Sequence, residues 1–422
     1  MKVIILCSLL CMLISCSESS STTDTDTTSS SSSSTQTSSS ESCPNVLFDS
    51  LPVDSILSIV PLGNSNPKSG HIFPTPHNYI YFDEQGASNL AEHNVKSPGD
   101  ITISSIETMQ YTDKTTQALS TDYSINFTSS LCSDVTGYYK HIKGLDSTLN
   151  DTLSTSSKQC NSYDTGNQNV ERCNYTLTYE LNSGDIIGTV GGTGQEQANF
   201  DFGIIDSRTK LQFLDQNYYW NEFYYMVCPW DYYATDFKST HEISTKFGIK
   251  ENGFDFVYRQ GDPKCGVFMQ DDADSAKGNW LLSTQPSFEK EDYHIALIES
   301  NYDSSKSIFS IGSDSGVISN NKSYRSEFSP NPNTASYIGQ DFDTLTSGNI
   351  YCYSSSDETD YKISSDSQNS SGQTTTHLRI LIYLVDNATL KIGTDYQTTS
   401  CNSPFDVTVL NSLNPITFKR DV

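Results

Sequence analysis

The cysteines of this sequence give its most direct chemical prediction, which is the formation of disulfides. The sequence has 11 cysteines, of which Cys7, Cys11 and Cys16 lie in an apolar stretch at the start of the chain. The others are widely spaced, are even in number and contain no C-x-x-C pair, which argues against a zinc ribbon and predicts up to four disulfides in an oxidising compartment. Free buried thiols are the alternative. The disulfide candidates are Cys43, Cys132, Cys160, Cys173, Cys228, Cys265, Cys352 and Cys401.

Sequence alone leaves the pairing of these cysteines open. Eight cysteines allow about 105 connectivities. Cys160 and Cys173 flank a short polar segment and are the most plausible local pair.

Histidines form the second group, because imidazole binds metals and acts as a base near neutral pH. Most of them lie in the first half of the chain. His71 and His77 enclose Pro74 and Pro76, which indicate a rigid loop. A histidine beside a strand is also commonly a hydrogen-bonded structural residue, so position alone assigns no role.

Charge excludes one class of partner. The chain has 51 acidic and 25 basic residues in 422, for a formal net charge of −26. Such a chain repels a phosphate backbone, and no basic stripe offsets the excess, so nucleic acid is not expected as a partner. No G-x-S-x-G segment occurs, which leaves serine hydrolase chemistry without its usual motif.

The amino terminus predicts an anchor. Residues 1–16 contain Lys2 and then an apolar run too short to span a bilayer, which is typical of a signal peptide. Their end, Leu13-Ile14-Ser15-Cys16, resembles the bacterial lipobox, so we expect a lipid on Cys16 and attachment to the outer membrane or cell surface. An ordinary secretory signal is the alternative. Residues 17–42 are rich in Ser and Thr and predict a flexible linker.

The remaining chain predicts a mainly β protein. Short apolar alternations separated by turn residues indicate strands at 79–82, 101–103, 123–127 and 378–385. The segment Lys140–Leu153 has apolar residues at nearly helical spacing and is predicted to form one short helix. A break near 239–253 predicts two domains, 43–245 and 250–422, the second a β-sandwich or barrel-like domain of unknown role.

An ordered series of segments lies within residues 96–205. It comprises Lys96–Asp100, Gly137–Ile142, the glycine-rich Gly184–Gly194 and Asn199–Ile204. In this order the segments resemble the core of the lysostaphin/LytM-type zinc endopeptidases. The resemblance implies an antiparallel β fold and, in active relatives, cleavage of peptide cross-bridges in peptidoglycan.

In that family an H-x-x-x-D motif and the last His of an H-x-H motif hold the zinc. The first His of H-x-H and the His of a Y-x-H motif assist catalysis. This chemistry needs three protein ligands, an open position for water and a group that accepts the proton of that water.

The motif residues of this chain match only partly. His141 keeps the Y-x-H position, whereas Asn199 and Asp201 replace the histidines of H-x-H. An amide cannot act as a base at neutral pH. Thr75 and Tyr81 stand four residues after His71 and His77, where the family has Asp.

A rearranged metal site is one hypothesis. His71, His77 and Asp201 would hold zinc and His141 would act as the base, since two imidazoles and one carboxylate suffice for this metal. The favoured hypothesis is a degenerate relative that binds a peptidoglycan or envelope-protein partner without cleaving it and needs no cofactor. A structural or adhesion lipoprotein is the third.

Two interpretations apply to the aromatic segments Tyr218–Tyr225 and Trp230–Tyr233. Rings interspersed with polar groups suit stacking on a sugar or peptide, so these segments could line a binding groove. The other interpretation, which we favour, is packing in the core or between domains.

Overall fold

The computed structural model describes residues 43–422 except 88–89, 193–197, 217–218, 251–252, 286–289, 357–360, 364–376 and 403. The predicted signal peptide, the lipidation site Cys16 and the Ser/Thr linker therefore lie outside the described residues. Cys43–Val422 forms one compact unit. The protein is mainly β, as predicted.

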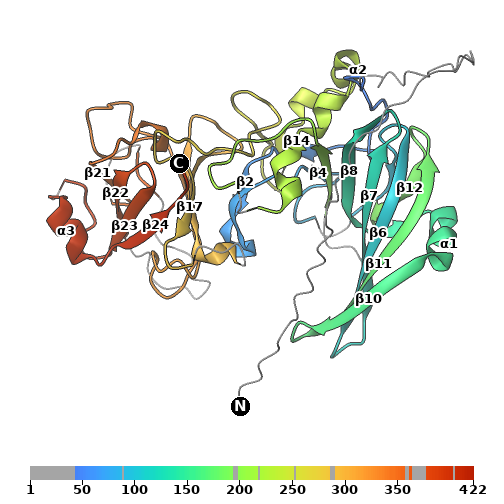
Figure 1. Ribbon diagram of the computed structural model, residues 1–422, viewed down its shortest axis with the longest axis horizontal. Coiled ribbons are helices and arrows are strands. Elements are labelled where there is room, and N and C mark those ends of the chain that lie inside the picture. Colours follow the sequence, from blue (N-terminus) through green and yellow to red (C-terminus); the bar gives the residue numbers. More distant parts are fainter. Residues whose placement is uncertain are drawn as a thin grey trace, which may run out of the picture. The chain divides into compact units, whose positions relative to one another are not determined.

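The first half is built on a nine-stranded antiparallel sheet (Figure 1). Its long central strands bury alternate apolar residues such as Ile125 and Phe127, which explains the period-two sequence pattern. In spatial order the strands are β1 (Ser58–Ile59), β4 (Tyr79–Tyr81), β13 (Asn199–Asp206), β8 (Cys132–Ile142), β7 (Leu119–Ser129), β6 (Ile101–Asp113), β11 (Gln168–Leu181) and β10 (Ser157–Asp164), with β14 (Met226–Val227) paired to β13.

Smaller elements pack on this sheet. A three-stranded sheet of β5 (Glu92–Lys96), β12 (Ile186–Gly191) and β9 (Gly144–Leu145) shares its hydrophobic core. The hairpin of β2 (Asn64–Asn66) and β3 (His71–Thr75) precedes β4, and β15 (Gly248–Ile249) pairs with β16 (Val257–Tyr258).

The predicted helix is present, but it begins later than expected. Lys140–Ile142 belongs to β8, and α1 spans Ser147–Thr155. The reason is local, because the Asp146 side chain accepts a hydrogen bond from the Thr148 amide at 2.9 Å and caps the helix there. Leu149 and Leu153 are buried one turn apart, as the spacing predicts.

The second half contains an eight-stranded antiparallel sheet. Phe328 on β20 and Tyr353 on β21 lie at opposite ends of the strand order, yet their rings are 5.5 Å apart. The sheet therefore curls until its ends approach, which is the barrel-like alternative of the prediction. The order is β20 (Tyr324–Phe328), β19 (Ser307–Ile311), β18 (Ile295–Glu299), β17 (Gly278–Leu282), β24 (Ile416–Lys419), β23 (Thr389–Asp395), β22 (Arg379–Asp386) and β21 (Ile350–Ser354).

The core does not stop at the predicted domain boundary. The hydrophobic cluster around the first sheet also takes in Ala296, Ile298 and Ile308 of the second sheet. The division into two domains at about 245–250 stays a prediction. The remaining helices are α2 (Thr235–Thr240) and α3 (Val407–Ser412).

All eight predicted cysteines form disulfides, and the predicted pair Cys160–Cys173 is confirmed. The other pairs are Cys43–Cys132, Cys228–Cys265 and Cys352–Cys401. Among the described helices α1 is the longest, at nine residues, and none is long and apolar enough to cross a membrane.

Candidate functional site

A polar pocket of about 500 Å³ is lined by several of the residues that the sequence analysis singled out. His71, Thr75, His141 and Asn199 all line it. They come from three strands, since β3 leads into β4, and β13 pairs with β4 on one side and β8 on the other. Sheet topology thus brings together positions up to 128 residues apart in the sequence.

The strand that carries His71 is held by the second half of the chain. The Ile72 and Phe73 amides donate to Glu291 Oε2 at 2.7 and 3.0 Å. Ser310 Oγ donates to the Ile72 carbonyl at 2.5 Å. Both groups fix the backbone of β3, so the second half of the chain positions His71 at the pocket.

Asp201 is not exposed to the pocket. Its side chain is completely buried, and Oδ2 lies 2.5 Å from His77 Nδ1. Burial alone would raise the pKa of Asp201, but the charge and hydrogen bond of His77 outweigh it, so the pKa is lowered. Asp201 and His77 therefore form a buried acid–base pair beneath the pocket.

Three aromatic rings, those of His71, Tyr79 and His141, connect this pair to the pocket. The His71 and His77 rings are 5.5 Å apart in an edge-to-face arrangement, and Tyr79 stacks on His77 at 5.3 Å. Tyr79 also stacks on His141 at 6.5 Å. Burial and the neighbouring His77 lower the pKa of His71, which keeps its imidazole neutral near pH 7.

His141 has a different electrostatic environment. Burial would lower its pKa, but the hydrogen bond to Asp122, with Nδ1 and Oδ2 2.9 Å apart, and the charge of that carboxylate raise the pKa overall. The residue has a φ of 67° at the end of β8, a conformation that few residues other than glycine adopt. Such backbone strain is typical of functional positions.

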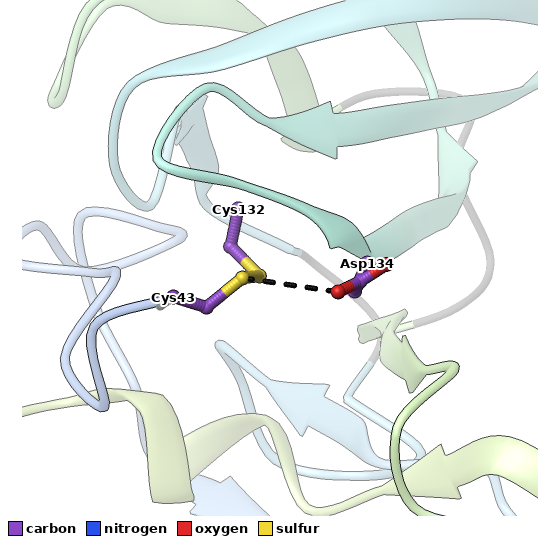
Figure 2. Close-up of side chains that lie close together, drawn as sticks. All are labelled: Cys43, Cys132 and Asp134. Carbon is purple, nitrogen blue, oxygen red and sulfur yellow. Dashed lines mark hydrogen bonds between the residues drawn. A yellow bond between two sulfur atoms is a disulfide. The ribbon is translucent and has the colours of Figure 1, made fainter. Parts of the chain in front are cut away.

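Among the described residues, His71, His77 and Asp201 are not a group of three donors within 4.8 Å of one another. In the part of the chain that the structure describes, one group of three His, Cys, Asp or Glu donors lies within 4.8 Å of one another, namely Cys43, Cys132 and Asp134. Figure 2 shows that the two sulfurs are bonded to each other. A disulfide has no thiolate to offer, so this group does not fit a metal either.

The structure adds residues that sequence reasoning missed. Tyr302, Arg325 and Glu327 of the second half line the same pocket. On β20 the residues alternate, with Tyr324, Ser326 and Phe328 buried and Arg325 and Glu327 half-buried. This alternation was readable in the sequence, but nothing local could show which cavity the charged face borders.

The aromatic cluster does not line this pocket. Tyr224, Trp230 and Tyr233 are buried in the first hydrophobic core, in agreement with the packing interpretation. Trp220 is the exception, at 65% exposure. Tyr218 lies outside the described residues.

No protein-family model, curated protein or solved structure that was compared with the chain matches it.

Proposed function

We propose that the protein is a cell-envelope lipoprotein, anchored by a lipid on Cys16, whose first half is a peptidase-like domain that binds a cell-wall or protein partner without cleaving it. One observation carries this proposal. His71, Thr75, His141 and Asn199, four positions of the family resemblance, border a single polar pocket.

The same geometry argues against cleavage. Hydrolysis by this family requires a metal with an open water position, and Asp201 is buried against His77 rather than turned toward the pocket. Asn199 offers an amide where a catalytic imidazole would stand, and Thr75 offers a hydroxyl where a carboxylate would bind zinc.

The pocket suits a polar, hydrogen-bonding ligand. Arg325 and Glu327 supply charges of both signs, while Asn199 supplies a donor and an acceptor. Tyr79 and Tyr302 add rings that can pack on a sugar or a peptide. Peptidoglycan presents this combination of peptide, carboxylate and sugar groups.

The covalent structure supports a location outside the cytoplasm. Four disulfides join cysteines that are 13 to 89 residues apart in sequence. Such bonds persist in oxidising compartments and are rare in a reducing cytosol.

Metal content separates the binding protein from the peptidase. The purified protein is expected to contain far less than one zinc per chain by elemental analysis, and a chelator is expected to leave its melting temperature unchanged, because Asp201 is already paired with His77. A triple variant, Thr75→Asp with Asn199→His and Asp201→His, restores the family motifs and serves as the comparison. Stoichiometric zinc in the natural protein, with destabilisation by chelator, would support the rearranged peptidase instead.

Retention on purified sacculi tests the partner. The protein is expected to co-sediment with sacculi, and the double variant Asn199→Ala, Arg325→Ala to bind about 30-fold more weakly, since each of the two changes removes hydrogen bonds worth about 1 kcal/mol. Lys158→Ala, on the exposed strand β10, is the matched control and should bind as the natural protein does. Absence of retention would favour an envelope-protein ligand or the structural role.

A further inference from the structure

A second pocket, of about 630 Å³, shares no lining residue with the polar pocket. The Cys228–Cys265 disulfide lies in its wall, together with residues of β14, α2 and the segment 263–269. Its volume falls in the range of sites that enclose small ligands, about 300 to 1,000 Å³. Trp230 and Asp231 of the aromatic segment Trp230–Tyr233 line it, whereas the family motifs contribute no residue to it.

The lining is mainly apolar and deformable. Ile243, Phe247 and Phe268 contribute apolar side chains. Met226 and Met269 line the pocket as well, so two of the five methionines of the chain meet here. Methionine is unbranched and polarizable, and it adapts to flexible apolar ligands.

The lining of this pocket has more basic than acidic residues, although the protein as a whole is acidic. Lys238 and Lys264 line it, with Asp231 as the one acidic residue, in a chain whose net charge is −26. In the described part of the chain no carboxylate lies within 4.0 Å of the Lys238 ammonium, and Lys264 has only Asp262 at 4.0 Å. The charge of Lys238 acts on the Asp231 carboxyl, but the lining still holds two ammonium groups against one carboxylate. Next to an apolar cavity this excess favours an anionic ligand with an apolar body.

We propose that this pocket binds a single-chain amphiphile, with its acyl chain among Met226, Phe268 and Met269 and its anionic head at Lys238 and Lys264. A carboxylate and a phosphate would both satisfy the lysines, so a free fatty acid and a lysophospholipid share the required chemistry. A peptide fits less well, because its backbone polar groups would be buried against an apolar lining without partners.

The test titrates the full, disulfide-bonded chain by calorimetry with three twelve-carbon ligands below their micelle concentrations. Laurate and lauroyl lysophosphatidylglycerol are anionic, and dodecanol is the uncharged match. We expect saturable binding of at least one anionic ligand, tighter than that of dodecanol. The preferred ligand identifies the source as fatty acid or lysolipid.

A variant that lacks both lysine charges tests whether the anionic head group of the ligand binds at Lys238 and Lys264. Lys238→Gln with Lys264→Gln is expected to weaken binding of the anionic ligand about tenfold, the effect of losing one to two charge-assisted contacts at a solvent-facing site. Binding of dodecanol should stay the same. Lys158→Gln with Lys290→Gln removes the same charge from exposed positions elsewhere and should change neither affinity.

An NMR measurement on the natural protein shows where the acyl chain of the ligand binds, without any substitution. With ¹³C-labelled methionine methyl groups, laurate should shift the NMR signals of Met226 and Met269 and leave that of Met109, on β6, in place. Lack of saturable binding by both anionic ligands, dodecanol affinity equal to that of the tighter anionic ligand, or shifts that avoid Met226 and Met269 would each overturn the proposal. Wall binding at the polar pocket is measured separately and does not affect this result.

Discussion

Replacing Asp201 by alanine is expected to lower the free energy of unfolding by about 1 to 3 kcal/mol, the usual cost of removing a buried hydrogen-bonding partner. Asp201 is fully buried on β13, and its Oδ2 lies 2.5 Å from His77 Nδ1. The variant leaves that imidazole beside an empty space without its acceptor. Urea denaturation followed by circular dichroism measures the loss.

The expected pH dependence of this effect follows from the direction of the pKa shift. The pKa of Asp201 is lowered in the folded protein, so the carboxylate stabilises the fold above its unfolded pKa of about 3.9. That stabilisation disappears as the pH falls through the lower folded pKa. The difference between Asp201→Ala and the natural protein should therefore shrink at strongly acid pH.

Two further variants make the interpretation specific. Asp164→Ala removes an exposed carboxylate that pairs with Lys114, and its effect on stability should be small. His77→Ala should destabilise the protein by an amount that is not additive with Asp201→Ala. Additive effects, or a loss below about 1 kcal/mol for Asp201→Ala, would contradict a strongly coupled buried pair.

The sequence predicted what depends on local pattern. Alternating apolar residues located strands such as β7, and Leu149 with Leu153 located a helix face. The helix start was misplaced because Ile142 happens to continue the helical spacing although it ends β8, whereas the Asp146 cap sets the true beginning. The disulfide Cys160–Cys173 could also be predicted from local sequence, since its two cysteines face each other across one hairpin.

The candidate site was predictable only as far as motif comparison reached. His71, His141 and Asn199 were selected by comparison with the motifs of the peptidase family, and all three line one pocket. The second wall of that pocket comes from β20, about 125 residues after β13. No local pattern specifies such a distant contact, and so Arg325 and Glu327 were missed.

Whether Asp201 binds a metal or pairs with His77 was equally undecidable from residue types. Both arrangements use the same imidazole and carboxylate, and they differ only in the direction of the side chains. The structure turns Asp201 inward, against His77. A similar dependence on side-chain direction applies to Glu291, which no sequence pattern singled out.

Glu291 connects the two halves at the strand that carries His71. Its carboxylate accepts hydrogen bonds from the Ile72 and Phe73 amides. Burial outweighs these two bonds and raises the pKa of Glu291 to about 7, against a usual value of 4.5. The folded protein therefore keeps this carboxyl protonated over a pH range in which the unfolded chain ionises it.

The glutamine variant at this position should be the more stable protein in mildly alkaline solution. A raised pKa means that the contribution of Glu291 to stability is greatest below pH 4.5 and declines as the pH rises to about 7. Glu291→Gln stays neutral and retains an acceptor for the two amides. We expect it to exceed the natural protein by about 3 kcal/mol near pH 8 and to equal it near pH 4.

Urea unfolding at a series of pH values measures this difference. Glu222→Gln, at an exposed position, removes the same charge and should leave the pH profile unchanged. Equal slopes for Glu291→Gln and the natural protein between pH 4.5 and 7 would show that Glu291 is ionised in the folded state. In that case the two amide hydrogen bonds, rather than burial, would determine the pKa of Glu291. An ionised carboxylate would then hold β3 to the second half of the chain.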